Sequence, residues 1–304
     1  MSVMQTPILY HYAMSPYSEK LRLALGATTQ EWGSVVVPAR PPRRALDVLL
    51  GGYRRIPVLQ MGAHFYCDSR LAFDALHDAR VSASRLNAED EALRQMAEQD
   101  IFFSVIAAAP QFRVFKYLRG QLGLAGTISF VCDRMQMMRS ATVMAPKRHL
   151  AAEKIAQYVL HLGRQLVKEP YLSGASLGYL DLFCYHPLWM AAKIDRTLML
   201  HWPKEVCEWM LRLDQMPRGV SRSYSLEAVT EAVENDQAEI AGEVSSLYRY
   251  GDSVALSPID YARDKTEGEL IALDTERVVI RRQISSSMRV YLHFPVRGFD
   301  LVKC

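Results

Sequence analysis

The spacing of apolar residues changes type twice along this chain, and that change limits the possible folds more than any other feature. The first 80 residues alternate short strand-like runs with helical patterns. From about Asn87 long patterns with a period of 3.6 residues take over, and after Ala241 strand-length segments return. At 304 residues the chain is long enough for two or three domains, each with its own core. We therefore expect an α/β region, an all-helical region and a small mainly-β region, in that order.

The N-terminal region predicts the element order β-α-β-α-β-β-α. Pro38 and the pair Pro41-Pro42 must end the second strand, and Gly51-Gly52 close the second helix. The expected strands are 7–12, 32–37, 56–60 and 64–67, and the expected helices are 16–27, 43–50 and one that opens at Asp68-Ser69.

The middle and the end of the chain predict helices and then an antiparallel sheet. Long helical patterns cover 88–109, 127–144, 147–167 and 202–216. We expect 81–87 to be the linker before this helical region, and the region to end near Asn235. The segments DSVALS, GELIAL, RVVIRRQI and MRVYLHF then have strand length, with turn residues between them. They suit a small β-barrel or a compact antiparallel sheet.

Charge and composition argue against several classes of partner. The chain has 36 Lys+Arg against 33 Asp+Glu, a net charge of +3, which does not favour nucleic acid or an anionic membrane. The longest notable apolar run, Ile101 to Pro110, is about half of the ~20 residues that a membrane-spanning helix needs. No secretory signal is visible at the start. The five cysteines lack any CxxC spacing, which suits reduced thiols in the cytoplasm better than disulfides or a zinc site.

The segment YHYAMSPYSEKLR, from Tyr10 to Arg22, contains the first candidate site. A strand runs into a loop that ends at Ser15, and Pro16 takes the first helical position, where its missing N–H costs nothing. Ser15 is then the N-cap. Two interpretations are open: the hydroxyl only caps the helix, or the hydroxyl and the free N–H groups behind it face an anion.

Two further segments could bind a ligand. In YRRIPVL, Pro57 lies inside a strand-like run, which requires an edge strand or a cis Ile56-Pro57 bond that turns the backbone N–H and C=O of Ile56 toward a ligand. Asp68-Ser69 begins a helix and, taken alone, is only an N-cap pair.

Taken in order, SPYSEKLRLAL, RRIPVL and CDSRLAFDAL resemble three motifs of the glutathione transferase family: its active-site loop and first helix, its cis-proline strand, and its acid-serine motif. The resemblance implies a thioredoxin-like glutathione-binding domain at 1–80 and an all-helical domain at 88–226. Residues 240–304 resemble an extra C-terminal domain of some fungal and bacterial members, with no known role. The family's buried aspartate falls on Asp181, where Gly178 replaces the usual Ser/Thr cap.

The resemblance also implies roles for individual residues. Ser15 falls where the family keeps its active-site Ser or Cys, and Tyr17 and Ser18 lie beside the same opening. A serine cannot form a mixed disulfide with glutathione, so the residue favours activation of the thiolate. Tyr10 and Tyr12 are weaker candidates, because both belong to the strand.

The other implied contacts hold the glutathione peptide. The backbone at Ile56-Pro57 would bind the cysteinyl part, and Asp68 and Ser69 the γ-glutamyl end. Arg54 or Arg55 either pairs with the glycyl carboxylate or is a solvated loop arginine.

The resemblance implies a glutathione-dependent transferase, isomerase or lyase that works as a homodimer and uses an electrophilic apolar second substrate. A helix N-terminus offers a thiolate about 0.3–2 kcal/mol, and a hydroxyl hydrogen bond about 1.5–3 kcal/mol. Together they can lower a thiol pKa by about one to three units. The alternative is a non-catalytic module that binds a ligand or dimerises.

Several other residues invite a functional interpretation. The aromatic residues Phe102, Phe103, Phe112, Phe115 and Tyr117 either line an apolar second-substrate pocket or belong to the core. His161 and the segment from Cys184 to His186 match no metal-ligand spacing, and we expect helix packing there. Arg43-Arg44 and Arg281-Arg282 are isolated basic pairs, which we expect to be solvated.

Overall fold

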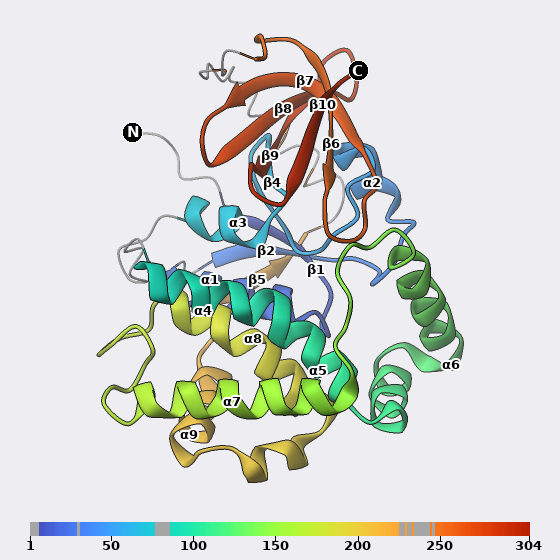
Figure 1. The fold of residues 1–304 in the computed structure, drawn as a ribbon. Helices are drawn as coiled ribbons and strands as arrows, with labels where there is room; N and C mark the ends of the chain where they lie inside the picture. The colour runs from blue at the N-terminus through green and yellow to red at the C-terminus, as the bar shows by residue number, and fades with distance from the viewer. Residues whose placement is uncertain are drawn as a thin grey trace.

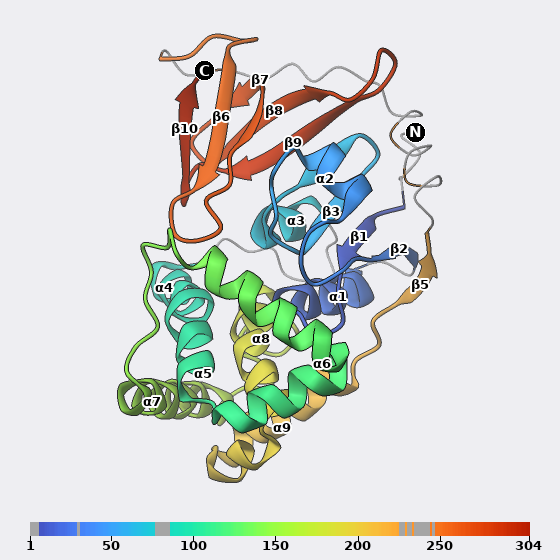
Figure 2. The same cartoon turned by 90° about the vertical axis from the view of Figure 1, so that its right-hand side faces the viewer.

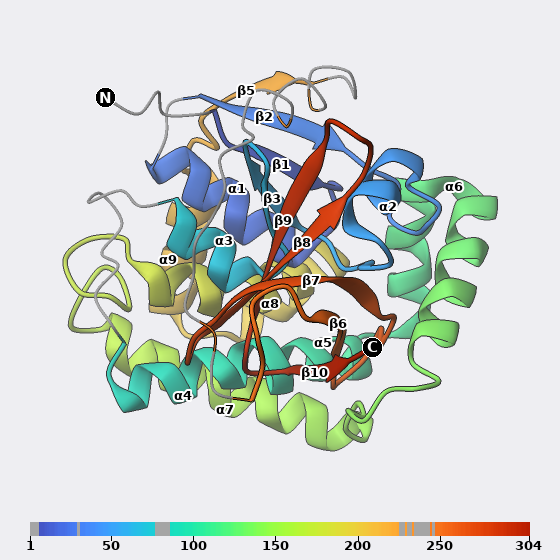
Figure 3. The ribbon, with the colours of Figure 1, turned by 90° about the horizontal axis from the view of Figure 1, so that it is seen from above.

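One continuous sheet connects both ends of the chain in the computed structural model. The structure describes residues 6–28, 31–76, 86–224, 229, 233, 244 and 247–304. Within them the sheet has ten strands in the order β10-β6-β7-β8-β9-β4-β3-β1-β2-β5 (Figures 1 and 3). The strands are β1 Ile8–His11, β2 Glu31–Val36, β3 Val58–Met61, β4 His64–Tyr66, β5 Val220–Ser223, β6 Ser253–Pro258, β7 Thr266–Leu273, β8 Arg277–Gln283, β9 Arg289–Pro295 and β10 Phe299–Lys303.

Most of the helices lie on one side of the N-terminal strands, and the C-terminal strands lie on the opposite side together with α2 (Arg44–Leu50), whose apolar residues share their core (Figure 1). The described helices are α1 Pro16–Thr28, α2 Arg44–Leu50, α3 Ser69–Ala75, α4 Ala88–Met96, the π-helix η1 Ala97–Ile101, α5 Phe102–Ala108, α6 Gln111–Met137, α7 Arg148–Leu166, α8 Tyr179–Ile194, the 3₁₀-helix η2 Arg196–His201 and α9 Lys204–Gln215. Together these elements confirm the thioredoxin-like N-terminal region and the helical region that follows it.

Strand pairing brings three connections to one end of the N-terminal sheet. β1 runs parallel to β2 and antiparallel to β3, so that Tyr10 lies opposite Val58. β3 in turn pairs antiparallel with β4, and Leu59 lies opposite Tyr66. The connection after β1, the connection before β3 and the connection after β4 therefore all lie at this end. These are the three segments in which the sequence predicts the site.

α8 is the central helix of the helical layer and is buried over most of its length. Asp181 in its first turn has no exposed surface. Its carboxylate accepts hydrogen bonds from the backbone N–H groups of Leu172 (2.8 Å) and Gly178 (3.1 Å) and from the indole of Trp209 (2.8 Å). Burial raises the pKa of Asp181, and these donors oppose that shift. Asp181 thus joins α8, α9 and the turn before α8, although Gly178 offers no side-chain cap.

The C-terminal strands extend the N-terminal sheet and share its core. β9 runs parallel to β4, with Tyr66 opposite His293. Apolar side chains of both regions form one buried cluster, which includes Tyr10 and Phe65 from the first and Leu292 and Phe294 from the second. A Cβ atom on Gly52 would lie 2.4 Å from the Lys265 carbonyl oxygen, so the two regions also meet beyond α2. The mainly-β segment predicted after residue 240 is therefore an extension of the same sheet.

The structure corrects several sequence expectations. The helix expected from 127 begins at Gln111, directly after Pro110, and breaks at Gly123, where φ is 68°. β5 and β10 were not expected. Most of the linker at 81–87 and of the segment from 225 to Asn235 lies outside the described residues.

The two basic pairs expected to be solvated include two arginines that are bound to backbone. Arg43 is 5% exposed and donates to the carbonyls of Pro38 (2.9 Å) and Arg54 (2.7 Å). Arg282 donates to the carbonyls of Val48 (2.8 Å) and Leu49 (2.7 Å) at the end of α2. Because a guanidinium has five donors, it can satisfy the carbonyl groups of a loop or a helix end.

In the described part of the chain, no single helix has both the length and the apolar character to cross a membrane. One pair of helical segments, Ala88–Ala108 and Gln111–Met137, passes the test of length and composition together, but the two are bent by 101°.

Candidate functional site

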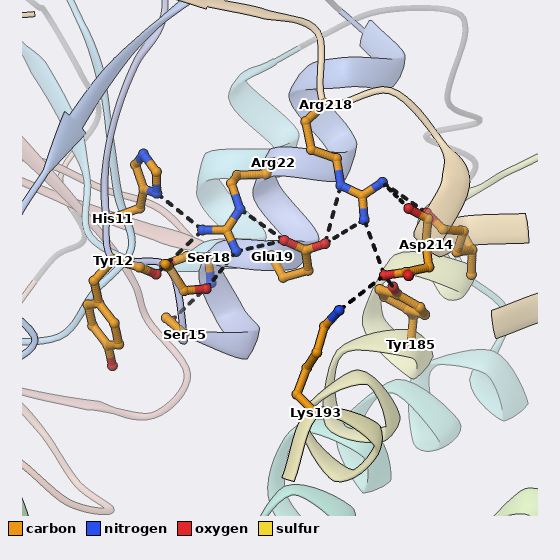
Figure 4. Close-up of polar contacts among 12 residues, drawn as sticks. His11, Tyr12, Ser15, Ser18, Glu19, Arg22, Tyr185, Lys193, Asp214 and Arg218 are labelled. Atoms are coloured by element: carbon orange, nitrogen blue, oxygen red, sulfur yellow. Dashed lines mark hydrogen bonds and ion pairs between the residues drawn. The ribbon is translucent and has the colours of Figure 1, made fainter. Parts of the chain in front are cut away.

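Ser15 ends the loop after β1 and caps α1. Its side chain is 2% exposed, and its Oγ accepts a hydrogen bond from the N–H of Ser18 at 3.1 Å (Figure 4). A hydroxyl has one donor and two acceptor positions, so this cap leaves the Ser15 O–H free to donate. The hydroxyl of Ser18 is also buried and has no hydrogen-bond partner among the described residues.

Arg22, two turns further along α1, fixes the backbone of this loop. It donates to the carbonyls of Tyr12 (3.4 Å) and Ala13 (3.1 Å) and contacts His11 Nδ1 at 3.1 Å (Figure 4). Since arginine can only donate, Nδ1 accepts and the Nε2–H of His11 donates to Ser34 Oγ at 2.8 Å. Burial, with the positive charge of Arg22, lowers the pKa of His11 to about 4. His11 is therefore neutral at physiological pH.

Glu19 connects α1 to the segment that follows α9. Its carboxylate pairs with Arg22 at 2.6 Å and with Arg218 at 2.6 Å, and its side chain is 6% exposed. Arg218 also donates to the carbonyls of Leu213 (3.1 Å) and Asp214 (3.0 Å). Figure 4 shows the resulting row of charges, which runs from the loop after β1 to the segment that follows α9.

The side chain of Tyr17 points into the contact between α1 and the helical layer. Its hydroxyl donates to the Glu98 carbonyl at 2.8 Å, and its ring lies 5.0 Å from Phe102 and 4.7 Å from His186. Burial raises the pKa of Tyr17 well above its usual value. The tyrosine next to Ser15 in sequence thus uses its hydroxyl at this contact. Tyr10 likewise donates to Gln60, at 2.7 Å.

The peptide bond between Ile56 and Pro57 is cis, directly before β3. Pro57 is buried. Among the described residues, neither the N–H nor the C=O of Ile56 has a hydrogen-bond partner.

Asp68 and Ser69 begin α3 at the same end of the sheet. Asp68 caps the helix by accepting from the N–H groups of Arg70 (2.8 Å) and Leu71 (3.3 Å). Ser69 is 7% exposed, and in the described part of the chain neither its N–H nor its hydroxyl has a partner. The hydroxyl of Tyr53 donates to the Cys67 carbonyl and so ties this segment to the loop before β3.

The two arginines before Ile56 are bound by acids from distant parts of the chain. Arg54 pairs with Asp133 of α6, and with Asp264 at 3.9 Å. Arg55 pairs with Asp260, donates to the Tyr261 carbonyl, and its guanidinium lies 4.1 Å from the centre of the Tyr261 ring. Neither arginine is simply solvated.

Arg55 nevertheless keeps one donor without a partner. Its Nε is buried and has no hydrogen bond within the described residues. A buried unpaired N–H of a cation is costly, and a ligand carboxylate would satisfy it.

Asp260 and Tyr261, between β6 and β7, are neighbours of the site that the sequence analysis missed. Asp260 lies 205 residues from Arg55 in sequence, and no local motif marks it. Figure 2 shows β6 running toward the helical layer, where its loop meets the chain after α6. There the Thr142 N–H donates to the Asp260 carbonyl at 2.7 Å.

The other candidates lie elsewhere. Phe103 contacts Tyr261, with ring centres 5.8 Å apart, whereas Phe112 and Phe115 are exposed on α6. His186 is buried, and burial lowers its pKa well below the usual value. The described residues contain no group of three or more His, Cys, Asp or Glu that could hold a metal ion. A cavity of about 340 Å³ lies between α8 and α9, and one of about 620 Å³ is lined by Phe112 and Tyr117 of α6 together with the end of α8. None of the residues predicted to bind glutathione or its thiol lines either cavity.

Comparison with known proteins concerns the fold of the region that holds these segments. Residues 9–82 match the family of glutathione S-transferase N-terminal domains. A GST-like protein from Pseudomonas syringae is similar in structure, with 25% sequence identity and a TM-score of 0.71 over 98% of this chain and 99% of that one. The agreement therefore includes the C-terminal strands.

A Tau class glutathione S-transferase from mango (Mangifera indica) shares the fold at 14% identity, with a TM-score of 0.50 over 70% of this chain and 90% of that one. No curated protein matches the chain significantly in sequence. The N-terminal match identifies a glutathione S-transferase N-terminal domain at residues 9–82, and the structural similarity to the GST-like Pseudomonas protein extends over nearly the whole chain.

Proposed function

We propose that this protein is a glutathione-dependent transferase, isomerase or lyase that activates the glutathione thiolate for attack on an electrophilic, apolar second substrate. The observation that carries the proposal is the pair of donors on Ser69, an N–H and a hydroxyl with no partner among the described residues. They lie where the family resemblance places the γ-glutamyl carboxylate. The unpaired Nε of Arg55 is a third donor at the same end of the sheet.

We assign the glutathione contacts segment by segment. Ser69 and Asp68 hold the γ-glutamyl end, and the free backbone groups of Ile56, before Pro57, hold the cysteinyl part. Arg55 meets the glycyl carboxylate through its unpaired Nε while it keeps its bond to Asp260.

Ser15 is the residue we assign to the thiol. Its O–H is free to donate, since the cap uses only an acceptor position. Ser18 is one turn further from the loop and has no exposed surface, and Tyr17 donates to Glu98, so both are weaker candidates. A hydrogen bond of about 1.5–3 kcal/mol from Ser15 would lower the thiol pKa by about one to two units.

A titration with glutathione tests the proposal. We expect the wild-type protein to bind glutathione by isothermal titration calorimetry. Ser69→Ala removes the hydroxyl and should weaken binding about tenfold, the loss of one hydrogen bond to a charged group. Ser221→Ala, in the exposed strand β5, is the matched control and should bind like the wild type. Undetectable binding by the wild type, or equal affinity of Ser69→Ala, would refute the proposal.

The competing function is a binding module without catalysis. The observation in its favour is that Ser15 already serves as a helix cap, a role that would preserve a serine without any chemistry. Loss of thiolate activation on replacing Ser15 distinguishes an enzyme from such a module.

We also propose a cytoplasmic homodimer. The five cysteines are free, as expected in a reducing compartment. α6 exposes the apolar side chains of Phe112, Ile128 and Met135, at 68%, 55% and 68%, which is typical of a surface that binds another protein. Sedimentation velocity at micromolar concentrations should therefore give a dimer, and a monomer throughout would contradict it.

A further inference from the structure

The loop between β6 and β7 carries the C-terminal strands into the candidate site. Asp260 pairs with Arg55, and the N–H of Tyr261 donates back to the Asp260 carboxylate at 2.9 Å. The other side of the loop is held by Thr142, whose N–H donates to the Asp260 carbonyl at 2.7 Å and whose hydroxyl donates to the Ile259 carbonyl at 2.9 Å. The loop is thus anchored on two sides.

The backbone of this loop has an uncommon conformation directly after Tyr261. Ala262 has a φ of 49° and is the one non-glycine residue with positive φ among those described. Such a conformation is unfavourable for an alanine and persists where the surroundings impose it. The ion pair of Asp260 with Arg55 and the backbone conformation at Ala262 together fix the position of Tyr261.

Two distant segments contact the Tyr261 side chain. The Arg55 guanidinium lies 4.1 Å from the ring centre, and the Phe103 ring lies 5.8 Å away at 89°. Burial raises the pKa of Tyr261, so its hydroxyl stays protonated. That hydroxyl has no hydrogen-bond partner among the described residues, and the side chain is only half-buried.

We propose that Tyr261 is a binding residue for the second substrate, which it selects as an aromatic electrophile. Its ring contacts Arg55, which we assign to the glycyl carboxylate of glutathione, and the aromatic side chain of Phe103. Two rings at a right angle offer an aromatic substrate both a face and an edge, which is the geometry that aromatic pairs prefer. The inference rests on the proposed function, because it requires glutathione in the adjacent groove.

Calorimetry with two probes tests this without depending on turnover. The probes are glutathione and its S-(2,4-dinitrophenyl) conjugate, which carries the aromatic group on the sulfur. We expect the wild type to bind the conjugate more tightly than glutathione. Tyr261→Ala should reduce this preference about three- to tenfold and leave the affinity for glutathione nearly unchanged.

Three further variants make the experiment decisive. Tyr261→Phe keeps the ring and should keep most of the preference. Tyr261→Leu fills a similar volume without a ring and should lose it, even if Tyr261→Ala destabilises the loop. Tyr250→Ala, at a tyrosine of the same region that is 53% exposed, is the matched control and should match the wild type.

The outcomes separate this inference from the proposed function. A wild type that binds neither probe refutes the proposed function, and this inference with it. A wild type that binds glutathione but shows no preference for the conjugate, or a preference that survives in both Tyr261→Ala and Tyr261→Leu, overturns the role of Tyr261 alone.

Discussion

Ser15 combines two roles in one hydroxyl, and the roles separate on mutation. As a cap it accepts from the Ser18 N–H, and as a donor it can stabilise a bound thiolate. Ser15→Ala should raise the pKa of bound glutathione by about one to two units and reduce turnover about ten- to a hundredfold. Loss of the cap should also cost about 0.5–2 kcal/mol of stability. Ultraviolet titration of the thiolate and thermal melts measure the two effects.

Ser18→Ala is the control for this prediction. It removes a buried hydroxyl that has no partner among the described residues, one turn along the same helix. We expect an unchanged thiol pKa and little loss of stability, since no hydrogen bond is lost. A Ser15→Ala protein that is destabilised but keeps its thiol pKa would show that Ser15 is only a cap, and would favour the binding module.

His11 should make the loop before Ser15 sensitive to acid. Its pKa is about 4 in the folded protein, against 6.5 for a free histidine. Between these values the unfolded chain binds a proton that the folded one does not, so the free energy of unfolding should fall as pH drops from about 6.5 to about 4. Two and a half pKa units correspond to at most about 3 kcal/mol.

Urea titrations at pH 7.5 and pH 5 measure this effect. The loss of stability between the two values should be smaller in His11→Asn than in the wild type. His161→Gln, on α7, is the control. His186 and His293 also have pKa values lowered by burial, so part of the loss should remain. An equal loss in His11→Asn and the wild type would contradict the prediction.

At the scale of elements, the π-helix η1 joins α1 to the helical layer. Glu98 within it accepts from the Tyr17 hydroxyl through its carbonyl, and its carboxylate pairs with Lys20 and Arg94. The Lys20 side chain is 1% exposed. Glu98→Gln removes the ion-pair partner of this buried cation and should cost about 3–5 kcal/mol, measured by urea titration.

The same π-helix offers a matched control. Asp100 pairs with Lys154 at 3.0 Å, but both side chains are about half exposed. Asp100→Asn should therefore change stability by less than about 1 kcal/mol. If Glu98→Gln and Asp100→Asn lost similar amounts of stability, burial of Lys20 would not explain the contribution of its ion pair to stability.

The sequence predicts an element well where local residues determine it, and poorly where the element depends on pairing with a distant part of the chain. The strands and helices of the N-terminal region lie within a few residues of expectation, because proline, glycine and capping residues mark their ends. β5 has four exposed residues and exists because it pairs with β2, a contact that no local pattern shows. The periodic pattern from 88 to 109 also does not show that the segment Ala97–Ile101 is a π-helix and not an α-helix.

The candidate site follows the same rule at the scale of the whole molecule. Ser15, Ile56 and Ser69 are recognisable because each belongs to a short motif, and strand order brings their segments to one end of the sheet. The contact of Asp260 with Arg55 depends on how a loop folds back over 205 residues of chain. From the sequence alone, Arg55 could be either solvated or bound to glutathione. The sequence does not reveal that Asp260 pairs with it.

The continuous sheet should make the N-terminal and C-terminal strands unfold together. Phe65 on β4 has no exposed surface and belongs to the core shared with Leu292 of β9. Phe65→Ala should cost about 3–5 kcal/mol, and hydrogen exchange followed by mass spectrometry should show lost protection in β7, β8 and β9 as well as in β1 to β4. Val302→Ala on β10, where the side chain is 46% exposed, is the control and should leave both regions protected. If Phe65→Ala loosened only the N-terminal strands, the C-terminal strands would be an independent domain that merely abuts the sheet. Their loop could then hold Tyr261 at the site only through its local contacts with Arg55, Phe103 and Thr142. Joint loss of protection would instead make the shared core the support that fixes Tyr261 beside Arg55.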